Sequence, residues 1–348
     1  AVLAWSHASL MANLWWFAAI SAAHMLTMAV MLRRSEIRGS SIPLPRDLRA
    51  RVQVHMRWTS LQVFVAALSN RTVETYLLGR LIGPAEVGYF AIATNLVRGG
   101  IELVSSSLTT ILMPSLAHAR GAGGVAQVNA IMQDTLRYFA VLGGLTAGLG
   151  WLLAEPGVNL LYGHRYGTVA HAVQVMSVIS GFFLIEAPFS SVLATLDDHR
   201  FKTGLSVLYF GLSAAFALWL VPEHGIMGAI AANGLTRMTT FLLCAVWVKR
   251  RLGLVVPWMD AGRALISVAG AMALASGLIY LVGGMLIHWL AGVVYVIGFI
   301  CMTLLTGLWK PKDIHLLIKL AQRFPAVAKV LAPILSRMPQ VADPSQRS

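Results

Sequence analysis

Residues 265–308 read LISVAGAMALASGLIYLVGGMLIHWLAGVVYVIGFICMTLLTGL, a stretch that contains no Asp, Glu, Lys or Arg. A helix that crosses the hydrocarbon core of a bilayer needs about 20 predominantly apolar residues. This part of the chain is therefore long enough for two crossings, which we expect at residues 263–283 and 286–308. Helices are expected because the sequence shows none of the period-2 alternation of a membrane barrel strand.

Hydrophobic stretches of similar length fill most of the remaining chain. Seven further spans are expected, at residues 9–32, 58–81, 87–116, 134–154, 168–193, 202–221 and 225–248. Composition agrees with this prediction, since 57% of the residues are apolar, 12% are charged and the mean hydropathy is +0.71. The sequence therefore predicts an all-α polytopic membrane protein with about nine transmembrane helices.

Basic residues fall in alternate connecting segments. Of the 27 Lys and Arg residues, 22 lie in the stretches 33–57, 117–137, 194–203, 249–263 and 309–348. The positive-inside rule places these segments, and so the C-terminal tail, on the cytoplasmic side. The net charge of +13 is then explained by basic loops facing anionic lipid headgroups, and no nucleic-acid partner is needed.

The order of these segments predicts a domain organisation. We expect a first helix at residues 1–32, a cytoplasmic basic linker at 33–57, a six-helix bundle at 58–248 and two additional helices at 249–308. The tail 309–348 is expected to be cytoplasmic and amphipathic, with Ile314, Leu317, Ile318 and Ala321 on one face of a helix. The chain opens at Ala1 in hydrophobic sequence, which favours a chain cut from a longer reading frame over a processed signal peptide.

Several smaller features narrow the chemistry. Gly144 and Gly148 are four residues apart, as in helices that pack closely, and Pro114, Pro156 and Pro188 are each expected to kink or end a helix. Cys244 and Cys301 lie singly in apolar spans and are interpreted as small hydrophobes. The ten His show no metal-binding spacing, so no metal site or cofactor is expected. Short outer segments leave no room for an external catalytic domain.

Polar residues inside the spans are the candidates for function, because an ionisable side chain within a membrane is costly. Three arginines lie near the middles of three different spans: Arg71, Arg98 and Arg237. Each has polar neighbours at helical spacing, namely Asn70, Glu74, Asn95, Glu102 and Asn233. The stripe of Asn95, Arg98 and Glu102 must face a cavity or a partner helix.

Two interpretations of these residues remain open. In the first, Arg71 with Glu74 and Arg98 with Glu102 are structural ion pairs, and Glu186 pairs with Arg237. In the second, the arginines and the Asn residues line a water-filled cationic cavity that binds phosphate, while the carboxylates hold the arginines or carry protons. Three arginines from three helices at similar depth favour the cavity.

Sequence motifs from about Arg46 to Arg251 carry a family resemblance. The motifs are NRTVETYLLGRLIGPAEVGYFAIATNLV at 70–97, PGVNLLYGHRYGTVAHAVQVM at 156–176 and HGIMGAIAANGLTRM at 224–238. In this order and spacing the chain resembles the Wzx-type polysaccharide or O-antigen flippases of the multidrug/oligosaccharidyl-lipid/polysaccharide (MOP) exporter superfamily, which also contains the MATE-type drug exporters.

The resemblance implies two six-helix bundles that work by alternating access on an undecaprenyl-pyrophosphate-linked oligosaccharide. Residues 1–32 would be the last helix of an otherwise missing N-terminal bundle, and 58–248 the MATE-like second bundle. The family's use of cavity arginines against pyrophosphate carries over to Arg98 first, then to Arg71 and Arg237. Implied partners are membrane lipids, a polysaccharide polymerase and a chain-length regulator, and the resemblance implies a location in the bacterial inner membrane.

Other functions are weighed against this one. A lipid II flippase is a close alternative, whereas a cation-coupled drug exporter would need a neutral or acidic cavity, which three arginines oppose. A membrane enzyme, such as a polysaccharide polymerase or a glycosyltransferase, is an alternative of a different class. Such enzymes need a sizeable outer loop with catalytic residues, and the largest outer segment predicted here is only Ala154 to Gly167.

Overall fold

The computed structural model describes residues 10–34, 45–69, 72–195, 199–254, 257–282, 285–310 and 313. Within these ranges every regular element is helical and no strand occurs. The chain divides into two compact units, residues 1–57 and residues 58–348, which are described separately. The all-α prediction is confirmed.

The first unit holds α2 (Leu10–Arg34) and the beginning of α3 (Arg46–Ser69), whose remainder belongs to the second unit. The second unit continues with α4 (Thr72–Leu81), α5 (Pro84–Tyr162), η1 (His164–Tyr166), α6 (Gly167–Phe182), η2 (Phe183–Ile185), α7 (Glu186–Thr195), α8 (His199–Leu252), α9 (Trp258–Val282) and α10 (Met285–Leu305). Helix thus covers most of each of the nine predicted spans within the described residues, although the 3₁₀ turn η2 lies inside the span 168–193 and α10 ends at Leu305, before the end of the span 286–308. Pro114 and Pro156 lie inside α5, so neither ends a helix.

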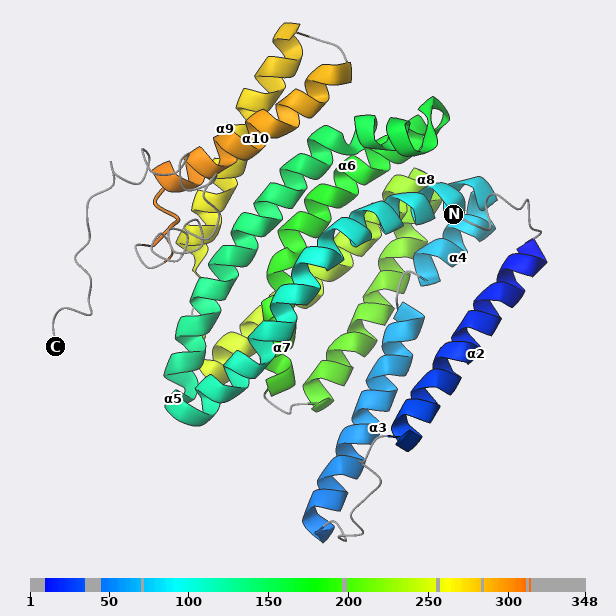
Figure 1. The fold of residues 1–348 in the computed structure, drawn as a ribbon, viewed down its shortest axis with the longest axis vertical. Coiled ribbons are helices and arrows are strands. Elements are labelled where there is room, and N and C mark those ends of the chain that lie inside the picture. The colour runs from blue at the N-terminus through cyan, green and yellow to red at the C-terminus, as the bar shows by residue number, and fades with distance from the viewer. Residues whose placement is uncertain are drawn as a thin grey trace, which may run out of the picture. The chain divides into compact units, whose positions relative to one another are not determined.

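The two longest helices are hairpins rather than straight rods. The backbone leaves helical geometry at Gly124 in α5, where φ is 63°, and at Gly225 in α8, where φ is 55°. Glycine adopts positive φ without a Cβ clash, so both residues permit a sharp reversal. Figure 1 shows α5 folding back on itself into a first leg, residues 84–123, and a second leg, residues 125–162; α8 does the same with legs 199–224 and 226–252.

Exposure along the helices is that of a protein solvated by lipid. Five helical segments are long and apolar enough to cross a membrane, and two of them contain the hairpin reversals, so crossings outnumber segments. Helix α9 buries Ala271 and Ala275 while it exposes Leu265, Ile266 and Tyr280. Large apolar side chains that face outward are stable only in an apolar solvent, so we conclude that the chain is a multi-pass membrane protein.

Close helix packing holds the second leg of α5 against α10. A Cβ added to Gly148 would lie 2.0 Å from the Tyr295 ring, and the Tyr295 hydroxyl donates to the Gly144 carbonyl at 2.7 Å. The predicted packing role of these two glycines is confirmed. The contact belongs to an apolar cluster that joins α5, α9 and α10, in which Ala271, Tyr295 and Phe299 are fully buried.

Helix boundaries refine the sequence prediction at α3. The expected single span 58–81 is covered by α3 as far as Ser69 and by α4 from Thr72, and residues 70 and 71 lie outside the described residues. Helix also begins earlier than expected: α3 starts at Arg46, so the second half of the predicted linker 33–57 is helical. The predicted amphipathic stripe in the tail 309–348 lies outside the described residues.

Candidate functional site

A cavity of about 580 Å³ lies within the second unit. Its walls come from the end of α3, the first leg of α5, the segment α6–η2–α7 and both legs of α8. The polar lining residues are Arg98, Ser105, Ser180, Glu186, Ser190, Ser206, Tyr209, Asn233, Arg237 and Thr240. Four predicted site residues, Arg98, Glu186, Asn233 and Arg237, therefore face one space, whose volume suits a small polar ligand.

Arg237 is held in place by three contacts on the α6–α7 segment. Its Nη2 and Nε lie 3.0 and 3.2 Å from Oε2 of Glu186, and Nη2 lies 3.5 Å from the Phe183 carbonyl oxygen. The guanidinium carbon sits 5.0 Å from the centroid of the Phe183 ring, within the range of a cation–π contact. The predicted pairing of Glu186 with Arg237 is confirmed, and the pair stands in the wall of the cavity.

A break between α6 and α7 places Glu186 at this wall. Pro188 has no backbone N–H, and its ring collides with the carbonyl four residues earlier, so a regular helix cannot run through it. The chain responds with the 3₁₀ turn η2 directly before α7, which starts at Glu186. The predicted distortion at Pro188 is confirmed, and its effect is to set Glu186 and Phe183 against Arg237.

Asn233 and Tyr209 form a second fixed pair in the wall, between the two legs of α8. The Asn233 side-chain amide donates to the Tyr209 hydroxyl at 3.2 Å, and only 8% of Asn233 is exposed. Asn233 lies one helical turn before Arg237, so both point to the same face of the second leg. The lining thus offers a fixed guanidinium with an amide and a phenol beside it.

Arg98 reaches the cavity from the first leg of α5, whereas Arg237 and its partners lie on α8, η2 and α7. Arg98 is exposed, and Ser105, about two turns further along the same leg, also lines the cavity. Asn95 on this leg is exposed and is absent from the described lining. Two cationic side chains from different helices therefore share one space, as the cavity interpretation predicts.

Glu74 lies outside the cavity lining, in a fully buried position on α4. The Ser213 hydroxyl on the first leg of α8 donates to Oε1 of Glu74 at 2.8 Å. Among the described residues no donor reaches its Oε2. Glu74 is therefore a buried carboxyl group with one oxygen bonded to Ser213 and one without a described donor.

The remaining predicted site residues cannot be placed. Asn70 and Arg71 fall in the gap between α3 and α4 and lie outside the described residues. Glu102 belongs to α5, but its side chain is outside the described part of the structure. The predictions for these three residues and for Asn95 stay predictions.

Comparison with known proteins finds relatives that match part of the chain. Residues 8–171 match the family model described as "Polysaccharide biosynthesis protein". The chain is 22% identical over 170 residues to the lipid III flippases of Escherichia coli (strain K12) and of Shigella flexneri, a match that covers 47% of this chain and 40% of each relative. Among solved structures it resembles the lipid II flippase MurJ in an inward closed conformation, with a TM-score of 0.59 and 12% identity. The chain thus resembles polysaccharide biosynthesis proteins over residues 8–171 and shares the fold of MurJ.

The extent of these matches differs between the two kinds of comparison. The structural match covers 69% of this chain and 51% of the MurJ chain. This chain therefore spans about half or less of the length of the relatives it matches. The likeness to MurJ confirms the predicted fold class of a helical membrane protein.

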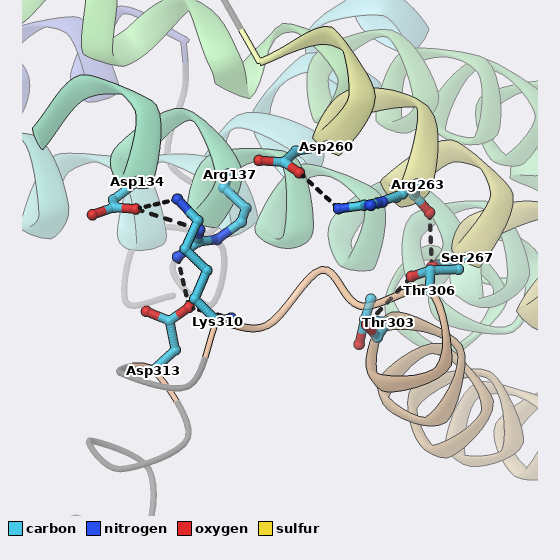
Figure 2. Close-up of polar contacts among 9 residues, drawn as sticks. All are labelled: Asp134, Arg137, Asp260, Arg263, Ser267, Thr303, Thr306, Lys310 and Asp313. Atoms are coloured by element: carbon cyan, nitrogen blue, oxygen red, sulfur yellow. Dashed lines mark hydrogen bonds and ion pairs between the residues drawn. The ribbon is translucent and has the colours of Figure 1, made fainter. Parts of the chain in front are cut away.

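A second polar cluster joins the end of α10 to α5, and sequence reasoning missed it. Nη2 of Arg137 lies 2.6 Å from Oδ2 of Asp313, which also accepts from the Lys310 backbone at 2.9 Å, and the Tyr138 hydroxyl donates to Oδ1 of Asp313. Asp134 completes the cluster, 3.3 Å from Nη1 of Arg137 and 3.1 Å from Nζ of Lys310 (Figure 2).

Burial in this cluster corrects the sequence interpretation of Arg137. We grouped Arg137 with the basic loop residues that face lipid headgroups, but only 2% of its side chain is exposed. Its ion-pair partner Asp313 is equally buried, and the pair ties the segment after α10 to the second leg of α5.

Proposed function

We propose that this chain is part of a flippase that translocates undecaprenyl-pyrophosphate-linked oligosaccharide across the bacterial inner membrane by alternating access. The product would serve the synthesis of O-antigen, capsule or exopolysaccharide. The observation that carries the proposal is the presence of Arg98 and Arg237 in the wall of one cavity. Such a protein moves its substrate without making or breaking a covalent bond, so the proposal is a transporter and not an enzyme.

Two guanidinium groups suit a pyrophosphate headgroup for a physical reason. Guanidinium is planar and permanently charged, and its N–H groups match two phosphate oxygens at once. In a cavity of low dielectric, such contacts are stronger than they would be in water. The hydroxyl and amide groups of the wall, including Asn233, can then receive the first sugar residues through neutral hydrogen bonds.

Glu186 would act on the substrate through Arg237. Its carboxylate fixes the guanidinium against Phe183, and it also occupies hydrogen-bond donors that a phosphate would use. A phosphate and this carboxylate therefore compete for the same side chain, which provides a means of release. In this proposal Glu186 is a positioning residue, whereas Glu74, buried and short of donors, is the candidate for ion coupling. We retain Asn70, Arg71, Asn95 and Glu102 as proposed members of the site.

Alternative substrates within the superfamily differ in what they require of this cavity. Lipid II carries the same pyrophosphate, and the likeness to MurJ makes a lipid II flippase the nearest alternative. A drug exporter for cations would place its substrate between two arginines at an electrostatic cost. A polysaccharide polymerase and a chain-length regulator are the proposed protein partners.

Binding to the full chain tests the proposal. Native mass spectrometry in detergent should show tight binding of undecaprenyl pyrophosphate and little binding of undecaprenol, which lacks the charges. Arg98→Ala should remove this preference, whereas Arg80→Ala, at an exposed position on α4 outside the described lining, should leave it unchanged. Equal binding of the pyrophosphate and the alcohol by the unmodified chain would contradict the proposal.

A further inference from the structure

A second cavity, of about 310 Å³, lies between the two legs of α5 and beside α6. Its lining includes Leu96, Val97, Leu149, Leu153 and Val173, and no charged residue is among its lining residues. This wall is therefore apolar, whereas the wall of the cationic cavity is charged and polar. We refer to it as the apolar groove.

The apolar groove has two side-chain hydroxyls among its lining residues. The Thr146 hydroxyl donates to the carbonyl oxygens of Leu142 and Gly143 at 2.9 and 3.1 Å, within its own helix. Ser177 packs against Gly150, where an added Cβ would approach its Oγ to 2.4 Å. The other lining residues are apolar side chains and glycines, so the natural occupant of the groove is a hydrocarbon.

The apolar groove and the cationic cavity meet on the first leg of α5. Ile101 lines both of them, and Arg98 lies three residues before it in the cationic wall. Along a helix this spacing is about 4.5 Å. The change from a charged wall to a hydrocarbon wall therefore occurs within one turn of a single helix.

We propose that the apolar groove holds the first isoprenoid units of the lipid anchor while its pyrophosphate sits in the cationic cavity. The inference rests on the proposed function and adds the place of the lipid chain. A polyprenyl pyrophosphate has its charge and its hydrocarbon joined by one phosphoester bond, so its binding site must change polarity over the same short distance.

Glycines in the wall allow the groove to be filled without disturbing the fold. At Gly100 and Gly157 no heavy atom lies within 4 Å of an added Cβ, although both residues line the groove. Leucine also has a higher helix propensity than glycine, so neither substitution should weaken its helix. Gly211 on α8 is a matched control, since it is exposed, equally open and absent from both linings.

The experiment compares two pyrophosphates that share a headgroup and differ in chain length. Undecaprenyl pyrophosphate and dimethylallyl pyrophosphate are titrated against the purified full chain and its Gly157→Leu, Gly100→Leu and Gly211→Leu variants. We expect the two groove variants to bind the long-chain ligand about tenfold more weakly, as for an overpacked site, and the short-chain ligand unchanged. The Gly211→Leu variant should match the unmodified chain with both ligands.

Each alternative outcome has a separate meaning. Unchanged long-chain binding in both groove variants, with binding still lost in Arg98→Ala, would overturn the groove and leave the cationic cavity intact. Failure of the unmodified chain to bind either pyrophosphate would overturn the proposed function and the groove together. A photoreactive group on the first isoprenoid unit should label peptides that contain residues 96–101 or 146–161, and labelling of the outward face of α9 instead would also refute the groove.

Discussion

Removal of the Asp313 carboxylate should lower the free energy of unfolding of the second unit, by an amount that follows from the burial of its partner Arg137. In the Asp313→Ala variant the Arg137 guanidinium, of which 2% is exposed, loses its partner at 2.6 Å. Breaking a buried ion pair on one side costs about 3–5 kcal/mol. Asp134 remains 3.3 Å from Arg137 and is itself 20% exposed, so we expect the lower end, about 3 kcal/mol.

A double-mutant cycle isolates this contact. Replacing both charged residues, Arg137→Met with Asp313→Leu, leaves no buried charge unpaired, so it should recover most of the lost stability. The control is Arg263→Ala, because Arg263 and Asp260 form a pair at 3.4 Å that is 39% and 18% exposed. Exposed pairs contribute about 0–1 kcal/mol, so this variant should unfold close to the unmodified chain.

The assay is thermal unfolding in detergent, followed by intrinsic tryptophan fluorescence. The single variant should unfold several degrees earlier than the control, and the double variant should return toward the unmodified midpoint. The substitutions Arg137→Met and Asp313→Leu are also measured singly. If the stability lost by the double variant equalled the sum of these two single losses, Arg137 and Asp313 would not be coupled, and the contact between α5 and the segment after α10 would be refuted.

Further predictions test the packing and the orientation of the chain. Gly148→Val should weaken the contact with Tyr295 and cost about 1–3 kcal/mol in the same unfolding assay, whereas Gly211→Val should cost much less; equal losses would show that the α5–α10 approach is unimportant. For topology, single cysteines at Ser41 and His164, in a background that lacks Cys244 and Cys301, should be labelled from opposite sides of the membrane. Labelling of position 41 from outside intact cells would overturn the predicted orientation.

Hydropathy predicted the spans because each crossing is a local property of about 20 residues. The sequence left two interpretations of the intramembrane charges open, since such charges must find partners or water. The ion-pair interpretation predicted that Arg237 would meet Glu186, and the cavity interpretation predicted that Arg237 would share a space with Arg98. Tyr209 and Ser213 were missed, although two polar residues one turn apart in an apolar leg of α8 carried a usable signal. No local signal could have revealed the pairing of Arg137 with Asp313, because 176 residues separate them and only the docking of α10 brings them together.

The hairpin reversals show a different limit of sequence reasoning. Gly124 and Gly225 are two of 31 glycines, and nothing in their immediate composition distinguishes a positive φ from ordinary helix. The chain must turn between two consecutive spans. The predicted ends of the spans therefore located the two reversals better than the presence of a glycine did.

Translocation by Arg98 variants tests the central claim most directly. The measurement is the amount of lipid-linked oligosaccharide in the outer leaflet of cells that lack their own flippase and carry the unmodified protein or a variant. Arg98→Ala should abolish translocation at normal protein abundance, because the pyrophosphate loses one of its two guanidinium partners, and Arg98→Lys should retain part of it, because lysine keeps the charge but not the planar fork. The double variant Arg98→Ala with Glu102→Ala should stay inactive. Recovery of translocation in that double variant would show that Arg98 serves only to pair with Glu102, and would contradict a pyrophosphate-binding cavity.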